Sequence, residues 1–317
     1  MNKLIIVFSI LVISCSSYIK PNNTSEPIAT PIQNLPASTA VEKQLLIKRG
    51  RDYFISNLDG SIITKLYSGQ EQPLESAGLS PDYTQFAYFK DNFVYIQNIE
   101  TNQTVSLNSD VIGGLGGYME WSPNEQKIIF TCSKEELGFS VCLINTENGN
   151  IEKIISTNNA DEFCLNKYIY FLDWSDDGST IVYSCFEVLE QGQKQPVSVF
   201  FYSVAQKNSI KILDNSDQNP IWNLISGTIS PDNNNLLLTG SDANSNLQIF
   251  IYNILSKQLT QLTNEDGYQF QSQAWFDNES FYLYKTSKQP PYTSTNYIMK
   301  LSGEILSTVN IDGIVIK

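Results

Sequence analysis

The sequence predicts an all-β fold, a β-propeller of four-stranded antiparallel blades. A short marker recurs five times, and the intervals between successive copies are 42, 53, 55 and 46 residues. Each copy is followed by short runs rich in Tyr, Ile, Val and Phe that are separated by polar turns. Repeats of about 40 to 50 residues, each containing four short strands, are typical of propeller blades.

The marker consists of a large apolar residue followed by a turn signal. Its Ser and Asp side chains can bond nearby backbone amides, its Pro fixes φ, and Asp, Asn or Gly follows where the chain reverses. We therefore place it between the first and second strands of each blade, with the preceding Trp or Ile packed between sheets. Five copies of a turn indicate architecture rather than catalysis or metal binding. The copies occupy residues 79–82, 121–124, 174–178, 229–232 and 275–278.

Two β-rich apolar runs after each marker predict the second and third strands of the blade. The second strands are expected at residues 85–88, 128–131, 181–184, 236–239 and 281–284. The third strands are expected at residues 93–96, 141–144, 199–202, 249–252 and 297–299. A brief fourth strand closes each unit, as at residues 257–263.

The first and last segments of the repeat region could together form one further blade. Residues 43–68 have the pattern of a blade without its first strand, with a hairpin turn at 57–60, and residues 313–316 form a spare strand. Joining them would complete a sixth blade and close the ring, which removes exposed sheet edges. We therefore expect six blades, with seven as the alternative.

These repeats resemble the TolB-like β-propeller family, a WD40-like family. Its blades carry Trp-Ser-Pro-Asp-Gly after the innermost strand and a closing Leu-Thr near the outermost strand. The resemblance covers residues 43–317, with two departures: the turn glycine remains only as Gly178, and Phe276-Asp277 replaces Ser-Pro in the last copy. It implies a role in envelope assembly or sensing as a context, although a fold does not determine a function.

The N-terminus has the layout of a secretory signal. A positive start at Lys3 precedes an apolar run at residues 4–13, and ten residues at about 1.5 Å each span only half a bilayer core. The following Val-Ile-Ser-Cys resembles the lipobox of bacterial lipoproteins, which implies a signal peptide at 1–14 and a lipidated Cys15. An ordinary cleaved signal with a chance cysteine is the alternative.

The sequence predicts a tether in the segment that follows the signal peptide. Residues 15–42 contain four prolines among Asn, Ser and Thr, without a periodic apolar pattern. The expected organisation is therefore a signal peptide, a lipidated tether and a propeller at 43–317. This places the propeller in the cell envelope, anchored to the outer face of the cytoplasmic membrane or to the outer membrane.

Four further cysteines, Cys132, Cys142, Cys164 and Cys185, are expected to form disulfides, because export leads to an oxidising space. Their spacing lacks any Cys-x-x-Cys pair, which disfavours zinc. A hairpin centred near Leu137 would place Cys132 opposite Cys142. Cys164 and Cys185 would then form the second pair, because both are expected near the same end of the next blade.

Composition restricts the chemistry. The chain has no histidine, and Arg49 and Arg51 are its only arginines. This excludes Ser-His-Asp and Cys-His nucleophiles and an arginine triad of the sialidase kind. The net charge of -13 argues against a nucleic-acid partner. No cofactor or metal is predicted: residues 242–246 begin like a calcium loop but lack its Gly and its Glu, so we expect a polar hairpin turn.

We therefore predict a non-catalytic scaffold that binds an envelope protein, a peptide or a cell-wall component. Extra residues gather at the face formed by the turns between second and third strands and by the links between blades, which we call the loop-rich face. The alternative is a carbohydrate-active enzyme or lectin that uses carboxylates and exposed Trp or Tyr in the central channel, although no acid pair is singled out by the sequence. The extra residues lie at 133–140, 187–197, 287–296, 111–117 and 156–165.

Overall fold

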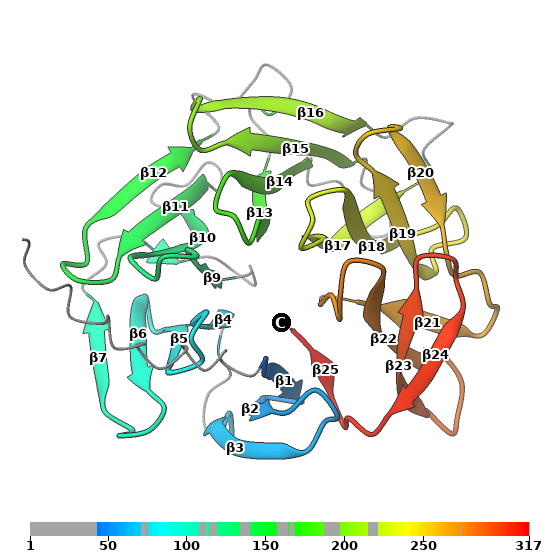
Figure 1. Ribbon diagram of the computed structural model, residues 1–317, viewed down its shortest axis with the longest axis horizontal. Helices are drawn as coiled ribbons and strands as arrows, with labels where there is room; N and C mark the ends of the chain where they lie inside the picture. Colours follow the sequence, from blue (N-terminus) through cyan, green and yellow to red (C-terminus); the bar gives the residue numbers. More distant parts are fainter. Residues whose placement is uncertain are drawn as a thin grey trace, which may run out of the picture. The chain divides into compact units, whose positions relative to one another are not determined.

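Six antiparallel sheets surround a central axis in the computed structural model, and each runs outward from an inner strand (Figure 1). The structure describes residues 43–70, 74, 76–107, 112–113, 119–133, 140–156, 164, 168–186, 197–214, 221–272 and 274–316. The predicted signal peptide, Cys15 and the tether lie outside these residues. The propeller belongs to the compact unit Val41–Lys317. No helix in the described part of the chain is long and apolar enough to cross a membrane.

Five blades follow the chain in order from the inner to the outer strand. Blade 2 consists of β4 (Ser76–Leu79), β5 (Gln85–Lys90), β6 (Phe93–Asn98) and β7 (Thr104–Leu107). Blade 3 consists of β9 (Met119–Trp121), β10 (Lys127–Ser133), β11 (Ser140–Asn145) and β12 (Ile151–Ile155), and β8 (Ile112–Gly113) also pairs with β10. Blade 4 consists of β13 (Tyr168–Trp174), β14 (Thr180–Phe186), β15 (Val197–Ser203) and β16 (Asn208–Asp214). Blade 5 consists of β17 (Trp222–Ile229), β18 (Asn235–Ser241), β19 (Leu247–Asn253) and β20 (Gln258–Gln261). Blade 6 consists of β21 (Tyr268–Gln271), β22 (Ser280–Ser287), β23 (Ser294–Lys300) and β24 (Ile305–Val309).

Blade 1 combines both ends of the propeller. It consists of β25 (Ile314–Val315), β1 (Leu45–Arg49), β2 (Asp52–Ser56) and β3 (Ile62–Tyr67). In the antiparallel pair of β25 and β1, Val315 lies opposite Ile47, and the Ile316 amide donates to the Leu46 carbonyl at 2.8 Å. The predicted closure and the predicted number of six blades are therefore confirmed.

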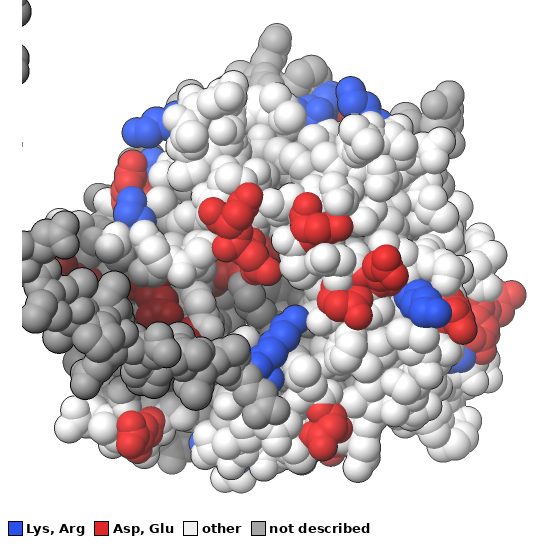
Figure 2. All heavy atoms as spheres, viewed as in Figure 1, with Lys and Arg blue, Asp and Glu red and all other residues white. Residues whose placement is uncertain are grey.

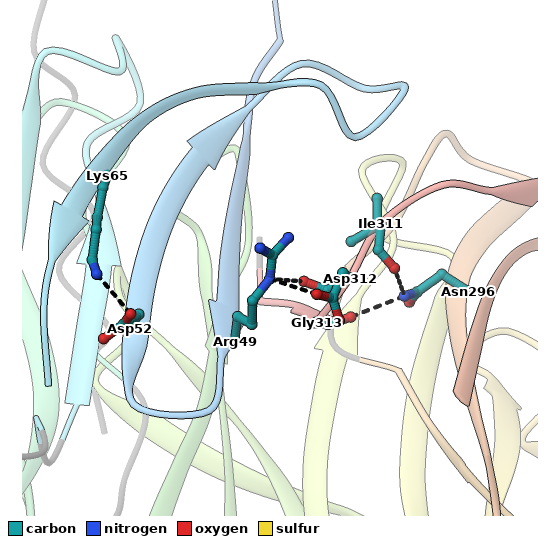
Figure 3. A network of polar contacts seen from close by, with 7 residues as sticks. All are labelled: Arg49, Asp52, Lys65, Asn296, Ile311, Asp312 and Gly313. Atoms are coloured by element: carbon teal, nitrogen blue, oxygen red, sulfur yellow. Dashed lines mark hydrogen bonds and ion pairs between the residues drawn. The ribbon is translucent and has the colours of Figure 1, made fainter. Parts of the chain in front are cut away.

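Polar contacts hold the C-terminal segment between blades 6 and 1 (Figure 3). The Arg49 Nε donates to the Asp312 carbonyl at 2.8 Å and lies 3.0 Å from its carboxylate. The Asn296 amide of β23 donates to the Ile311 and Gly313 carbonyls at 2.7 and 2.9 Å. Gly313 has a φ of +132°, and a Cβ there would lie 2.6 Å from the Lys48 carbonyl oxygen, so glycine is required.

The marker forms the turn between first and second strands, as predicted. In blade 5, the Ser230 hydroxyl donates to the Asp232 carboxylate at 2.6 Å and accepts the Asn235 amide at 2.9 Å. Ser80 and Ser175 repeat both bonds in blades 2 and 4. Ser122 does the same in blade 3, where the acceptor is the side-chain amide oxygen of Asn124. The marker serines are buried, so the bonds satisfy polar groups that water does not reach.

The apolar residue that begins each marker packs between neighbouring blades. All five, Leu79, Trp121, Trp174, Ile229 and Trp275, are buried. Two of the indoles also donate to the preceding blade: Trp121 to the Gly78 carbonyl at 3.3 Å and Trp275 to the Thr228 carbonyl at 3.1 Å. The core accordingly consists of six apolar clusters, one between each pair of adjacent blades.

Two disulfides join Cys132 to Cys142 and Cys164 to Cys185, with Cα–Cα distances of 5.9 and 5.6 Å. These are the pairs expected from the strand map. The predicted position of Cys132 directly opposite Cys142 is wrong, because Cys132 pairs with Ser140 and Phe130 pairs with Cys142. The hairpin is centred one residue earlier, and the two cysteines are diagonal neighbours on one face of the sheet, within the separation that a disulfide requires.

Candidate functional site

A cavity of about 350 Å³ opens on the axis of the ring, at the end where the marker turns lie. We call it the central cavity. Its wall combines the ends of the inner strands with the marker prolines Pro81, Pro123 and Pro231. The chain enters the propeller at its mouth, through Lys43 and Gln44. Figure 2 shows acidic side chains gathered around the hollow at the centre of the ring.

One position of each repeat faces the cavity in blades 2 to 6. It is the residue directly before the large apolar residue of the marker, and all five of its occupants line the cavity: Gly78, Glu120, Asp173, Thr228 and Ala274. Three consecutive blades, 3 to 5, therefore contribute side-chain oxygens at this level. The flanking blades 2 and 6 contribute the small residues Gly78 and Ala274. At Gly78 a Cβ would lie 2.5 Å from the Met119 carbonyl oxygen, so the close approach of β4 to β9 needs a glycine.

Both carboxylates are tied to the next blade. Glu120, whose exposed fraction is 6%, accepts the Trp174 amide at 2.8 Å, and Asp173 accepts the Ile229 amide at 2.7 Å. Each bond links the inner strand of one blade to that of its neighbour. The bonds also fix the direction of the two carboxylates.

Asp173 lies in an environment that disfavours its charge. Burial raises the pKa of Asp173 well above its ordinary value, and the charge of Asp176 raises it further, whereas hydrogen bonds from the Ile229 and Trp174 amides lower it. The side chain keeps part of its surface open to the cavity. Protein nevertheless surrounds it on the other sides, so solvation by bulk water is largely lost.

The mouth of the cavity holds one positive group. The Lys43 ammonium donates to the Trp275 and Phe276 carbonyls at 3.0 and 3.2 Å. Burial lowers the pKa of Lys43, while the charges of Asp176 and Asp277 oppose this shift. Lys43 is the one cationic residue in the wall, against Glu120, Asp173 and Asp176, as far as the described residues extend.

Further acids lie in the marker turns. Hydrogen bonds from the Ser179 amide and the Ser175 and Ser179 hydroxyls lower the pKa of Asp177. The Asp177 carboxylate also accepts the Asn233 amide group of the next blade at 2.8 Å. The negative charge of Asp177 is therefore favoured, and it contributes to a negative potential at this end of the ring.

None of the predicted site residues that the structure describes lines the central cavity. Cys15 lies outside the described residues, and the four other cysteines are placed in the disulfides. Most residues of the predicted long loops on the loop-rich face also lie outside the described part, except in the loop between β22 and β23, where Tyr292 is 73% exposed. Asp242 forms a polar hairpin turn, as expected, by accepting the Asn244 and Asn246 amides at 2.8 and 2.9 Å.

The sequence reasoning missed Glu120, Asp173, Thr228 and Lys43. The signal that could have found the first three is their shared place before the marker, since alignment of the repeats puts them at one level of the ring. No group of three or more potential metal-ligating side chains occurs among the residues that the structure describes.

Comparison with known proteins defines the fold. Residues 33–136 match the model of the dipeptidyl peptidase IV (DPP IV) N-terminal region. No match was found among curated proteins. The structure is similar to TolB from Acinetobacter baumannii, with a TM-score of 0.60 and 13% identity over 86% of this chain and 65% of that chain. The chain thus spans less than two thirds of the length of that TolB.

Two further solved structures are also similar to this chain. A putative TolB from Agrobacterium tumefaciens has a TM-score of 0.57 and 11% identity over 85% of this chain and 91% of that chain. Hydrazine synthase from Kuenenia stuttgartiensis has a TM-score of 0.52 and 14% identity over 85% of this chain and 80% of that chain. The fold is therefore a TolB-like β-propeller, and at these identities the similarity extends to the fold alone.

Proposed function

We propose that this chain is a non-catalytic ligand-binding propeller of the bacterial cell envelope, anchored to a membrane by a lipid on Cys15. The observation that carries the binding function is the central cavity. Binding sites commonly occupy concave surfaces of about 300 to 1,000 Å³ that combine apolar walls with a few polar groups. The central cavity has this composition, with three tryptophans beside Glu120, Asp173 and Lys43.

The partner we propose is an envelope protein, a peptide or a cell-wall component. The absence of histidine from the whole sequence supports binding rather than catalysis, since the common nucleophile and base arrangements need an imidazole. The TolB-like fold supports the envelope as the location, and the N-terminal pattern supports the anchor.

Capture of partners from envelope extracts tests which face binds. Asp176→Lys reverses a charge at the exposed mouth of the central cavity, and Tyr292→Lys changes an exposed side chain on the loop-rich face. We expect full-length protein and Tyr292→Lys to capture the same partner, and Asp176→Lys to lose it. Loss with Tyr292→Lys alone would assign binding to the loop-rich face instead.

The anchor is tested separately by metabolic labelling with a fatty acid. Wild-type protein should incorporate the acyl label and partition into detergent, whereas Cys15→Ala should do neither. Wild-type protein without the label would contradict the lipid anchor, while leaving the binding function in place.

One observation favours a second candidate, a carbohydrate-active enzyme or lectin. Glu120 and Asp173 line one cavity, and a carboxyl group with a raised pKa, such as Asp173, can act as a general acid. A glycan array with the full-length protein, followed by product analysis, distinguishes this candidate. Cleavage of a glycan that is lost in Glu120→Gln would replace the binding function by catalysis.

A further inference from the structure

The ring of residues before the marker presents three oxygen-bearing side chains from consecutive blades. Glu120, Asp173 and Thr228 line the same cavity at the same repeat position, in blades 3, 4 and 5. The turn chemistry of the marker does not require them, because Gly78 and Ala274 occupy the same position in blades 2 and 6. The marker turn therefore does not explain their joint presence, although Glu120 and Asp173 also bond amides of the next blade.

The charge of this group is not balanced around Asp173. Among the residues that the structure describes, no lysine or arginine lies within ion-pair distance of Asp173, and its charged neighbour is another acid, Asp176. A desolvated carboxyl in this position gains from a cation or from a proton. A cavity lined by one sign of charge also attracts ligands of the opposite sign.

The third oxygen of the set is unsatisfied. The Thr228 hydroxyl is buried in the cavity wall, and it has no hydrogen-bond partner among the described residues. A buried polar group without a partner costs free energy that a ligand donor would recover. A ligand that donates hydrogen bonds would satisfy this oxygen once the Thr228 side chain turned it toward the cavity, because the oxygen itself is buried in this structure.

An ammonium group fits these three features. It carries one positive charge and three N–H donors, and it has no acceptor, so it matches sites that offer only carboxylate and hydroxyl oxygens. The methylene stem of a lysine would meet indole rings, because Trp121, Trp174 and Trp275 line the same wall. The mouth already holds such a group, since the Lys43 ammonium is bound there by two carbonyls.

The geometry points to an ammonium-bearing ligand in the central cavity, either a lysine side chain or a free amino terminus of a partner, held by Glu120, Asp173 and Thr228. This inference rests on the proposed binding function and names the chemistry of its ligand. It selects the protein or peptide partner over a neutral glycan. A lysine side chain and an amino terminus share the group, so the test has to separate them.

Tryptophan fluorescence of the full-length protein in detergent provides the assay, because three tryptophans line the cavity. The probes are Nα-acetyl-lysine amide, its uncharged counterpart Nα-acetyl-norleucine amide, and glycinamide, which offers a free amino terminus. We expect saturable binding of the lysine probe or of glycinamide, and no saturation with the norleucine probe at the same millimolar concentrations. The stronger of the two amines identifies the source of the ammonium group.

Variants assign the binding to the three residues. Glu120→Gln, Asp173→Asn and Thr228→Val should each weaken amine binding, the two charge removals by about tenfold or more, because a hydrogen bond to a charged group is worth about 1.5 to 3 kcal/mol. Glu147→Gln is the matched control, because it removes the same charge from an exposed turn of blade 3. Thermal unfolding of each variant shows whether it is folded.

Each other outcome has a definite meaning. Equal binding of the lysine and norleucine probes would overturn the ammonium inference and leave the cavity as a binding site. Saturation with calcium chloride but not with the amines would replace the ammonium group by a metal ion. Binding of none of the amine probes would overturn the inference. The assignment of partner binding to the central cavity would fall with it only if Asp176→Lys also captured the partner as well as wild type does.

Discussion

Removal of the C-terminal strand should destabilise the whole propeller rather than one end of it. The perturbation is deletion of residues 313–317, which removes β25 from blade 1. The side chain of Val315 is 3% exposed, and it packs in the cluster between blades 6 and 1 with Ile47 and Ile311. Deletion therefore opens the inner edge of β1 and exposes part of this cluster.

The magnitude follows from what the segment buries and bonds. A fully buried valine contributes about 1.5 to 3 kcal/mol. Backbone hydrogen bonds of β25 with β1, and the bond from the Ile316 amide to Leu46, contribute about 1 kcal/mol each. The total is about 4 to 6 kcal/mol. In a domain of this size 1 kcal/mol corresponds to about 2 °C, so the melting temperature should fall by about 10 °C.

Thermal unfolding followed by circular dichroism measures this effect, with urea unfolding as an independent probe. Val315→Asp should reproduce most of the loss without shortening the chain. Leu255→Asp is the control, because Leu255 is an exposed apolar residue outside the closure, and it should cost less than about 0.5 kcal/mol. Arg49→Ala should cost at most about 1 kcal/mol, because its ion pair with Asp312 is exposed. A truncated protein that melts with the full-length protein would refute closure by β25.

Three further predictions concern a cavity acid, a marker turn and a disulfide. Asp173→Asn should raise the melting temperature at neutral pH and leave it unchanged below about pH 4. The pKa of Asp173 is higher in the folded state than its unfolded-state value of about 4, so the wild type loses stability as the pH rises above about 4. A difference in melting temperature that did not depend on pH would contradict this. Ser230→Ala should lower the free energy of unfolding in urea by about 1 to 3 kcal/mol, because it leaves a buried amide unpaired, whereas Ser256→Ala in an exposed turn of the same blade should cost clearly less. Peptide mapping of unreduced protein should recover Cys132 linked to Cys142, and breaking this ten-residue loop should cost about 2 to 3 kcal/mol; free thiols at both positions would exclude the bridge.

The fold could be predicted because the residues of the marker determine the turn that they form. Ser230, Pro231 and Asp232 specify a turn through bonds that span only five residues, and the same bonds recur in other blades. Closure was also predictable, because the blade at residues 43–68 lacked an inner strand and the strand at residues 313–316 belonged to no other blade. Each of these inferences needed only the repeat and the principle that sheet edges are paired.

The disulfide register shows where such reasoning stops. Side chains alternate between the faces of a strand, and the predicted and observed registers of the β10–β11 hairpin both put Cys132 and Cys142 on the same face. The pairing was therefore predictable. Which residue lies directly opposite each cysteine was not predictable, because this register depends on the conformation of the connecting loop, which the repeat does not define.

The candidate site was harder to predict because its contacts join distant parts of the chain. The Glu120 carboxylate bonds an amide 54 residues away, and the Asp173 carboxylate bonds one 56 residues away. Neither bond exists until adjacent blades stand side by side. Loop length pointed to the loop-rich face, whereas the central cavity lies at the opposite end of the ring. Binding at the loop-rich face remains a prediction, because most of those loops lie outside the described residues.

The marker and the position before it follow different constraints. The marker repeats because the turn requires its residues, while the preceding position holds Gly, Glu, Asp, Thr or Ala in different blades. An acid there is costly, since burial and the neighbouring Asp176 both disfavour the charge of Asp173. A folded propeller blade needs no such acid, because Gly78 and Ala274 occupy this position in two blades of the same molecule. Residues that the repeat does not require, and that burial makes costly as at Asp173, are candidates for function. On this reasoning Glu120 and Asp173, rather than the conspicuous Ser-Pro-Asp turns beside them, are the acids that ligand binding should depend on.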